Sequence, residues 1–191
     1  NPGNEEKEKN IMTRTRHRTD PDKTTYFVTS SVVNWIPLFS KPEIAQIALD
    51  SLDFMNNHKR LLIHAYVLME DHMHLLATSE NFSQEIRKLK SFTAKQIIDF
   101  LHSQRQYSYY LEILRDARQP FKNDQTYQVW QEGYHPQHIR DMDMYQNTME
   151  YIHMNPVKRG YVDYPEHWRY SSSRDYKGEP GLINITLLSP Y

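Results

Sequence analysis

Apolar residues in this chain change between strand-like and helix-like spacing in a fixed order, and that order constrains the fold more than any other feature of the sequence. Runs of β-branched and aromatic residues indicate strands, whereas apolar residues three and four apart indicate helices. The expected elements are a strand over residues 24–33, a helix ending at about residue 58, strands over 61–69 and 72–78, a helix over about 83–103, a strand over 127–130 and a helix from about 141 to 155.

This order, β-α-β-β-α-β followed by one further helix, predicts an α+β fold of the ferredoxin-like type, in which an antiparallel sheet carries two helices on one face. Ser40 and Glu43 have the spacing of a capping box and predict the start of the first helix. Pro156 is expected to stop the last helix, because proline has no amide hydrogen. The stretch before Pro120 has a poor helical pattern, and the part after Gly160 is expected to be irregular.

Residues 1–22 are polar and charged without apolar periodicity, and we predict that they form a disordered basic arm ahead of a single domain over residues 23–191. Arg14, Arg16 and Arg18 in this arm are candidate nucleic-acid contacts, although a solvated tail has the same pattern.

Glycine is absent from residues 4–132. The loops that cradle nucleotide phosphates need glycine for close approach of the backbone, so we expect no nucleotide cofactor. The absence of cysteine excludes disulfides, thiolate zinc sites and cysteine nucleophiles. We find neither a signal-peptide pattern nor an apolar run of about 18 residues, and we therefore expect a cytoplasmic protein with no membrane partner.

The charge of the chain is nearly balanced, with 23 basic and 24 acidic side chains and a net charge of −1. Any binding of nucleic acid must therefore come from local basic patches rather than from bulk attraction.

His72 and His74 are the first candidate ligands of a metal ion. Residues two apart on a strand share a face, so both imidazoles can hold one cation, while Met73 points to the opposite, buried face. Taken alone, the pattern is weak evidence for a metal site, because two histidines at this spacing can occur by chance in a chain with ten histidines. Asp71 is expected to be a turn residue aimed away from the metal, and His64 on the preceding strand is expected to be a satisfied core histidine.

Tyr151 and Asn155 lie four residues apart in the last predicted helix and therefore on one ridge of it. This ridge adjoins the apolar stripe that contains Tyr145 and Ile152, so both side chains are expected at the edge of a cleft. A packing tyrosine with its hydroxyl at the rim has the same pattern. His153 lies on the opposite face of the helix.

Two separate segments resemble one protein family. Residues 67–76, Val-Leu-Met-Glu-Asp-His-Met-His-Leu-Leu, are similar to the HUH signature of the single-tyrosine transposases of insertion sequences. Residues 151–162, which begin Tyr-Ile-His-Met-Asn-Pro, are similar to the catalytic-helix motif of the REP-associated tyrosine transposases. Further similarity lies at residues 86–97 and 168–172, so the resemblance covers roughly residues 24–176. Glu70 departs from it, because many relatives have proline there.

This resemblance implies a mechanism and a set of site residues. His72, His74 and Asn155 would bind a divalent cation, Mg²⁺ or Mn²⁺, and Tyr151 would be the nucleophile. The products would be a 5′-phosphotyrosine and a free 3′-hydroxyl, so no ATP is needed. The implied substrate is single-stranded DNA with a hairpin-forming repeat. The family contains dimers, but its REP-associated branch favours a monomer.

Local charge adds four candidate DNA contacts. Lys88 and Lys95 lie on a basic ridge of the second predicted helix, and Lys158 and Arg159 directly follow the catalytic motif. An ordinary solvated helix face has the same charge pattern. Two alternatives to the transposase chemistry remain at this point: a ferredoxin-like nucleic-acid-binding module without catalysis, and a metallohydrolase that uses the two histidines without a covalent step.

Overall fold

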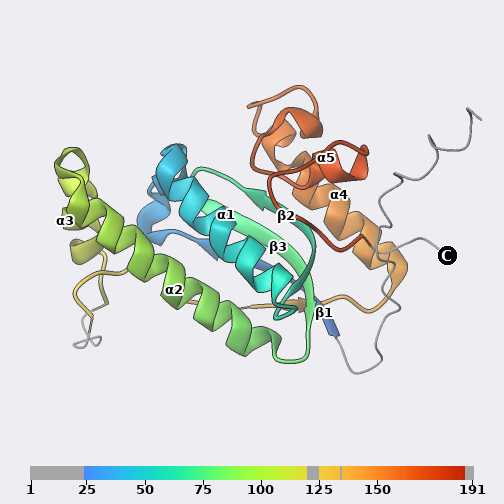
Figure 1. Ribbon diagram of the computed structural model, residues 1–191, viewed down its shortest axis with the longest axis horizontal. Helices are drawn as coiled ribbons and strands as arrows, with labels where there is room; N and C mark the ends of the chain where they lie inside the picture. The colour runs from blue at the N-terminus through green and yellow to red at the C-terminus, as the bar shows by residue number, and fades with distance from the viewer. Residues whose placement is uncertain (1–23, 120–124, 134, 188–191) are drawn as a thin grey trace, which may run out of the picture.

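Figure 1 shows the computed structural model, which describes residues 24–119, 125–133 and 135–187. Its strands and α-helices, in chain order, are β1 (Thr24–Ser31), α1 (Pro42–Asn57), β2 (Leu62–Leu68), β3 (His72–Ser79), α2 (Phe82–Ser103), α3 (Ser108–Asp116), β4 (Gln137–His138), α4 (Met142–Lys158) and α5 (Ser173–Tyr176). Short 3-10 helices lie at Val33–Trp35, Leu38–Ser40, Arg105–Tyr107 and Pro165–His167. The predicted arm with Arg14, Arg16 and Arg18 lies outside the described residues.

The four strands form an antiparallel sheet in the order β2-β3-β1-β4. The central pair runs from Thr24 opposite Ser79 to Ser31 opposite His72. At the other edge of β1, Tyr26 pairs with His138 of the short strand β4. This arrangement confirms the predicted α+β, ferredoxin-like order of elements.

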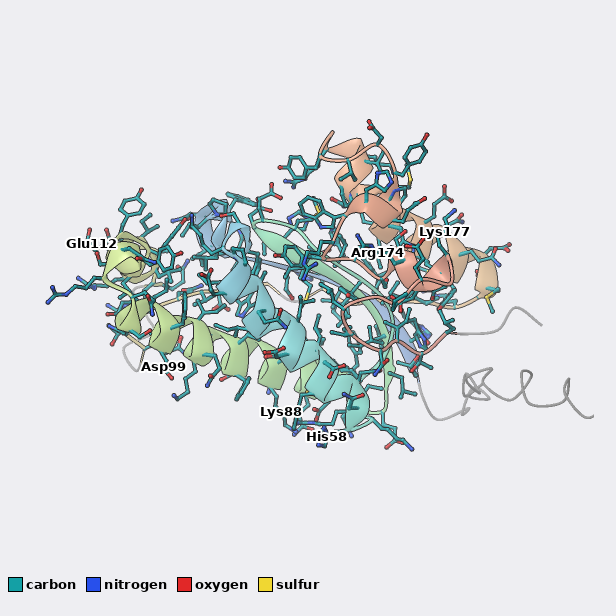
Figure 2. The ribbon with its side chains drawn as sticks, turned by 45° about the horizontal axis from the view of Figure 1, so that its top comes forward. His58, Lys88, Asp99, Glu112, Arg174 and Lys177 are labelled. Carbon is teal, nitrogen blue, oxygen red and sulfur yellow. The ribbon has the colours of Figure 1, made fainter. Side chains whose placement is uncertain are left out.

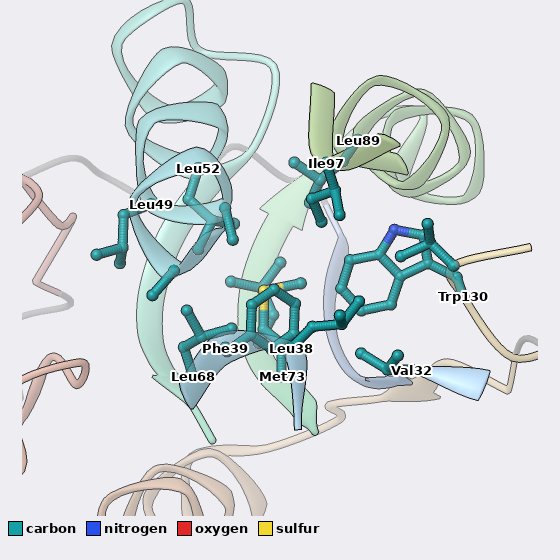
Figure 3. Packing of buried hydrophobic residues seen from close by; sticks show 14 of the residues in the cluster. Val32, Leu38, Phe39, Leu49, Leu52, Leu68, Met73, Leu89, Ile97 and Trp130 are labelled. Carbon is teal, nitrogen blue, oxygen red and sulfur yellow. The ribbon is translucent and has the colours of Figure 1, made fainter. Parts of the chain in front are cut away.

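One face of the sheet is covered by α1 and α2, and it holds the larger apolar cluster (Figure 3). Strand β3 contributes alternate side chains, Met73, Leu75 and Ala77, as its period of two requires. Leu52 of α1 and Leu89 of α2 meet them from above. Full burial of one such aliphatic side chain stabilises the fold by about 1.5–3 kcal/mol, so this face supplies much of the stability.

The opposite face of the sheet is covered by α4 through a smaller cluster of seven buried hydrophobic residues, which includes Val67, Leu76 and Ile152. The side chains of β3 that alternate with its core residues point to this face. His72 and His74 are among them, so the fold places both histidines between the sheet and α4.

Strand β2 contains an irregularity between Ile63 and Ala65 in its pairing with β3. His64 at this point is buried, with Nε2 2.7 Å from the Thr78 hydroxyl and Nδ1 2.8 Å from the Thr186 carbonyl oxygen. Burial lowers the pKa of His64 to about 4. The predicted satisfied core histidine is therefore confirmed.

The predicted fourth strand was wrong in position. In residues 127–130 the structure has only an isolated bridge, between Trp130 and Val32. The Trp130 indole donates to the Thr93 hydroxyl over 3.0 Å and lies against Phe39, with ring centroids 5.7 Å apart. The aromatic and β-branched pattern here reflects packing under α2, and the sheet edge is formed instead by the polar residues of β4.

Two predictions about helices were also wrong. Helix α3 forms in the stretch before Pro120, where Leu111 and Leu114 are buried. The capping box does not form, because the Ser40 hydroxyl donates to the Pro37 carbonyl and α1 has no side-chain cap.

Among the described residues, no helix is both long enough and apolar enough to span a membrane.

Helix α4 continues through Pro156 and ends at Lys158, contrary to the expectation that proline would stop it. Proline removes one backbone hydrogen bond, but the amides of Arg159 and Tyr161 still donate to the carbonyls of Asn155 and Pro156. The segment after Gly160 is likewise not wholly irregular, since it contains α5.

Candidate active site

His72 and His74 project from β3 toward α4, and both side chains are buried, at 6% and 4% exposure. Their ring centroids lie 4.7 Å apart, with planes inclined at 72°. Met73 between them packs into the core beneath α1 and α2. The strand therefore presents two neighbouring imidazoles on one face, as their spacing predicts.

The protonation of His74 follows from its two hydrogen bonds. Its Nε2 lies 3.0 Å from Nδ2 of Asn155, and an amide nitrogen can only donate, so Nε2 accepts. Nδ1 then carries the proton and donates to the Thr29 hydroxyl oxygen over 2.8 Å. Burial, with smaller effects of His72 and Arg159, lowers the pKa of His74 to about 3. The ring is thus neutral near pH 7, which is the state that binds metals.

His72 is oriented by the preceding residue, Asp71. Its Nδ1 donates to Oδ1 of Asp71, which leaves the lone pair on Nε2. The Asp71 backbone is held in turn, because its carbonyl accepts from the amide of Val32 over 2.8 Å. A carboxylate behind a histidine is the common second contact of metal-binding imidazoles.

Asp71 lies in the turn before β3, as expected, but the alternation rule does not account for its orientation. Strand β3 begins at His72, so the backbone of Asp71 does not follow the strand period. Its carboxylate is buried against Nδ1 of the His72 ring, on the side away from the Nε2 that would hold a metal ion. The missed signal was an acidic residue directly before the first histidine.

Helix α4 brings Tyr151 to the histidines. The residue before the helix, Asp141, caps its first turn, because its carboxylate accepts from the Met144 amide over 2.8 Å. Ile152 is buried against the sheet, whereas Tyr151 lies at the helix edge and is 42% exposed. The Tyr151 ring stands edge-on to His74, with centroids 5.3 Å apart.

Lys158 lies on the same side of α4 as Tyr151, two helical turns further on. Its Nζ is 5.5 Å from the centroid of the Tyr151 ring, a cation–π contact. This contact depends on the continuation of the helix through Pro156. The arrangement puts a positive charge beside an accessible phenol that also contacts the neutral imidazole of His74.

Comparison with known proteins connects this geometry to a family. No family model matches the chain. A proposed REP-associated tyrosine transposase of Haemophilus influenzae is 32% identical over 123 residues, which are 60% of this chain and 61% of that protein. The chain is a relative of the REP-associated tyrosine transposases. The match spans less than two thirds of that relative's length.

One of two similar solved structures shares the fold. The structure of a REP-associated tyrosine transposase bound to a REP hairpin has a TM-score of 0.59 and 18% identity, and the match covers 93% of this chain and 94% of that one. A proposed transposase from Deinococcus radiodurans has a TM-score of 0.45 at 18% identity, over 72% of this chain and 95% of that one. The first of these shows that the chain has the fold of a REP-associated tyrosine transposase.

The candidate DNA contacts are divided between two faces of this transposase-like fold. Lys88 and Lys95 lie on α2, which covers the sheet face opposite the histidines. Lys88 pairs with Glu85 over 2.8 Å, and Lys95 pairs with Asp99 on the same helix. The structure therefore brings Lys158 to the site and leaves both α2 lysines away from it.

Arg159 lies near the site, in a polar contact with the β2–β3 turn. Its Nη1 is 2.8 Å from Oε1 of Glu70 and 3.9 Å from Oδ1 of Asp71. The Tyr161 hydroxyl donates to the same Glu70 oxygen. Glu70, the residue that departs from the proline of many REP-associated relatives, thus ties the end of α4 to the turn that precedes His72.

The donor set fits a divalent cation. Among residues 24–119, 125–133 and 135–187, no group of three or more His, Cys, Asp or Glu side chains could hold a metal ion. The ligand set that the resemblance implies does not need such a group of three, because it consists of two imidazoles and the amide of Asn155. Both Nδ1 atoms donate to other groups, so in the neutral rings Nε2 carries the lone pair, and that of His74 accepts from Asn155. Asn155 would present its oxygen after a half-turn of the amide.

Proposed function

We propose that this chain cleaves and rejoins single-stranded DNA beside a hairpin, through a covalent bond between DNA and Tyr151. The observation that carries the proposal is the contact of Asn155 and Tyr151 with His74, because it joins residues of two motifs that are 81 and 77 positions apart in the chain. The named function of the Haemophilus relative and the hairpin bound to the solved relative support the same substrate class.

Tyr151 would act as the nucleophile. Its phenolic oxygen loses its proton and attacks the scissile phosphorus, which forms a phosphotyrosine bond and breaks the bond from phosphorus to the 3′-oxygen. The leaving 3′-oxygen takes up a proton, and the other DNA product stays attached through its 5′-phosphate. Attack of a 3′-hydroxyl on the phosphotyrosine reverses these steps, so the energy of the phosphodiester bond is kept without ATP.

A divalent cation, Mg²⁺ or Mn²⁺, would polarise the phosphate and neutralise charge on its oxygens when bound. His72, His74 and Asn155 would hold it, with Asp71 and Thr29 fixing the two rings. Lys158 would hold its charge beside the Tyr151 ring and contact the phosphate backbone of the substrate.

The complete residue set comes from one chain, because α4 lies against the sheet of its own domain. This geometry supports a monomer that cleaves DNA with its own tyrosine, rather than a dimer in which α4 serves the partner.

The test incubates the protein and Mn²⁺ with end-labelled oligonucleotides that carry hairpins with single-stranded flanks. We expect a covalent adduct on a denaturing gel for the wild type and none for Tyr151→Phe. The exposed Tyr164 provides the matched control, and Tyr164→Phe should keep the adduct. Cleavage by Tyr151→Phe would overturn the role of Tyr151. Tight hairpin binding without any adduct would instead favour the non-catalytic binding module.

A further inference from the structure

Two aromatic rings next to the site have no part in the chemistry above. Tyr161 follows α4 and is 47% exposed, although it has a large apolar ring. One of its faces is stacked on Trp168, with centroids 5.6 Å apart and planes inclined by 28°. We call these two rings the aromatic platform. An exposed ring that is backed by a second ring offers a flat face on which another aromatic group can stack.

The aromatic platform is anchored at its polar ends. The Tyr161 hydroxyl donates to Glu70, and the Trp168 indole donates to the Leu68 carbonyl oxygen over 3.0 Å. Trp168 also packs against the apolar cluster under α4. Both rings are thus fixed before any ligand arrives, and this lowers the entropic cost of stacking on them.

The anchors also place the aromatic platform beside the catalytic residues. Glu70 is two residues from His72, a distance of at most about 7 Å along an extended backbone. Lys158, three residues before Tyr161, contacts the Tyr151 ring. A nucleotide next to the phosphate that Tyr151 attacks can therefore reach the platform.

The segment that carries the platform is rich in basic side chains, of which Arg159 is paired with Glu70. Residues 158–174 contain four basic and two acidic side chains, in a chain whose net charge is −1. Arg169, next to Trp168, is exposed. An aromatic face within a basic segment is the combination that single-strand-binding proteins use, with cations on the backbone and rings on the bases.

We propose that Tyr161, backed by Trp168, stacks on one unpaired base of the single-stranded DNA adjoining the cleaved bond. The proposal rests on the proposed function for the identity of its ligand. Stacking tolerates any base, because every base has a π face, but it requires that a base be present. The aromatic platform therefore sets the position of the strand, and the hairpin supplies the remaining recognition.

The test couples removal of a base to removal of the Tyr161 ring. The probe is a labelled DNA hairpin with thymidine flanks on both sides, and abasic sites are introduced one by one along the flanks. Binding is measured by fluorescence anisotropy without metal, in the Tyr151→Phe background. We expect one flank position at which loss of the base weakens binding roughly tenfold. In the added variant Tyr161→Leu this penalty should fall below about twofold, on the same scale.

Two further variants separate stacking from structure. Tyr161→Phe keeps the ring but loses the bond to Glu70, and it should keep the penalty at that position. Tyr164 is 59% exposed and has an edge-on contact with His167, so Tyr164→Leu is the matched control and should also keep it. Equal penalties at every position with and without the Tyr161 ring would overturn the proposal, as would loss of the penalty only in Tyr164→Leu.

The adduct assay with the wild-type chain on the same probes distinguishes this failure from failure of the proposed function. An adduct at Tyr151 without coupling between base and ring refutes the aromatic platform alone. Coupling without an adduct refutes the covalent chemistry and keeps the platform. A chain that does not bind the hairpin refutes both.

Discussion

The two faces of the sheet are both buried, but they are built from different side chains. Beneath α1 and α2, strand β3 contributes Met73, Leu75 and Ala77, which need no hydrogen-bond partner. Beneath α4 the same strand contributes His72 and His74, whose ring nitrogens are bonded to residues of the preceding turn, of β1 and of α4. One face therefore stabilises the fold through the apolar surface area that it buries. The other face assembles polar groups whose positions depend on distant parts of the chain.

Leu75 and His74 are adjacent and test this contrast most strongly. His74→Ala should reduce adduct formation below detection, because it removes a proposed ligand and the partner of Asn155. Leu75→Ala should lower the free energy of unfolding by about 2–5 kcal/mol and leave the adduct, measured on the folded fraction, near its wild-type level. Urea denaturation and the adduct gel read out the two effects. An active His74→Ala variant would contradict the assignment of the α4 face.

Asp71 tests whether the second contact of His72 matters. Asp71→Asn should weaken Mn²⁺ binding about 10–100-fold, because an amide orients and polarises the imidazole less well than a carboxylate. Isothermal titration calorimetry with Mn²⁺ alone measures this. Asp163→Asn removes an equal charge from an exposed position nearby and should bind Mn²⁺ like the wild type. Unchanged affinity in Asp71→Asn would limit Asp71 to a structural role.

Acid sensitivity should also arise on the α4 side, since three histidines whose pKa is lowered by burial lie there, His64, His74 and His153. Burial lowers the pKa of His64 and of His153 to about 4, whereas an unfolded histidine titrates near 6.5. Below pH 6.5 the unfolded chain binds more protons than the folded one, so stability falls as the pH falls. Each of these histidines should cost about 2 kcal/mol between pH 7 and pH 5.

Urea unfolding at several pH values checks this expectation. His64→Gln should make the decline between pH 7 and pH 5 shallower, whatever its effect on stability at pH 7. An unchanged decline would show that His64 is not the titrating group.

Replacement of Lys158 is expected to have the smallest effect on adduct formation, and a matched lysine on α2 allows the two faces to be compared. Lys158→Met should slow adduct formation about 2–5-fold, the amount that an exposed cation–π contact provides. Lys95→Met, on α2, should not change the rate, because its partner is Asp99 and its helix covers the other face. A larger effect of Lys95→Met would restore the predicted DNA contact on α2.

The same contrast explains how far the sequence predicts this molecule. Periodicity predicts most of the order of elements, the core side chains of β3 and the shared face of His72 and His74, because these depend on neighbours in the chain. It does not find β4, whose two residues owe their strand conformation to pairing with β1. The aromatic pattern that ends at Trp130 leads to a wrong strand prediction, because the indole is buried through contacts with Thr93 and Phe39 and not through pairing within a strand.

The candidate site divides in the same way. Tyr151 and Asn155 are found from helical spacing and from the resemblance of their motif. Asp71 and Thr29 are not, because their roles arise only when the turn, β1 and β3 come together. The contact of Lys158 with Tyr151 depends on α4 continuing past Pro156, and the local rule for proline predicts the opposite.

The central claim is that DNA becomes linked to Tyr151 of the chain that supplies His74. Its most direct test is mass spectrometry of the protease-digested adduct, formed in an equimolar mixture of Tyr151→Phe and isotope-labelled His74→Ala chains and, separately, in the wild type. We predict a nucleotide on the Tyr151 peptide of the wild type and no adduct in the mixture. A nucleotide on another residue, or on Tyr151 of the labelled chains in the mixture, would contradict this account.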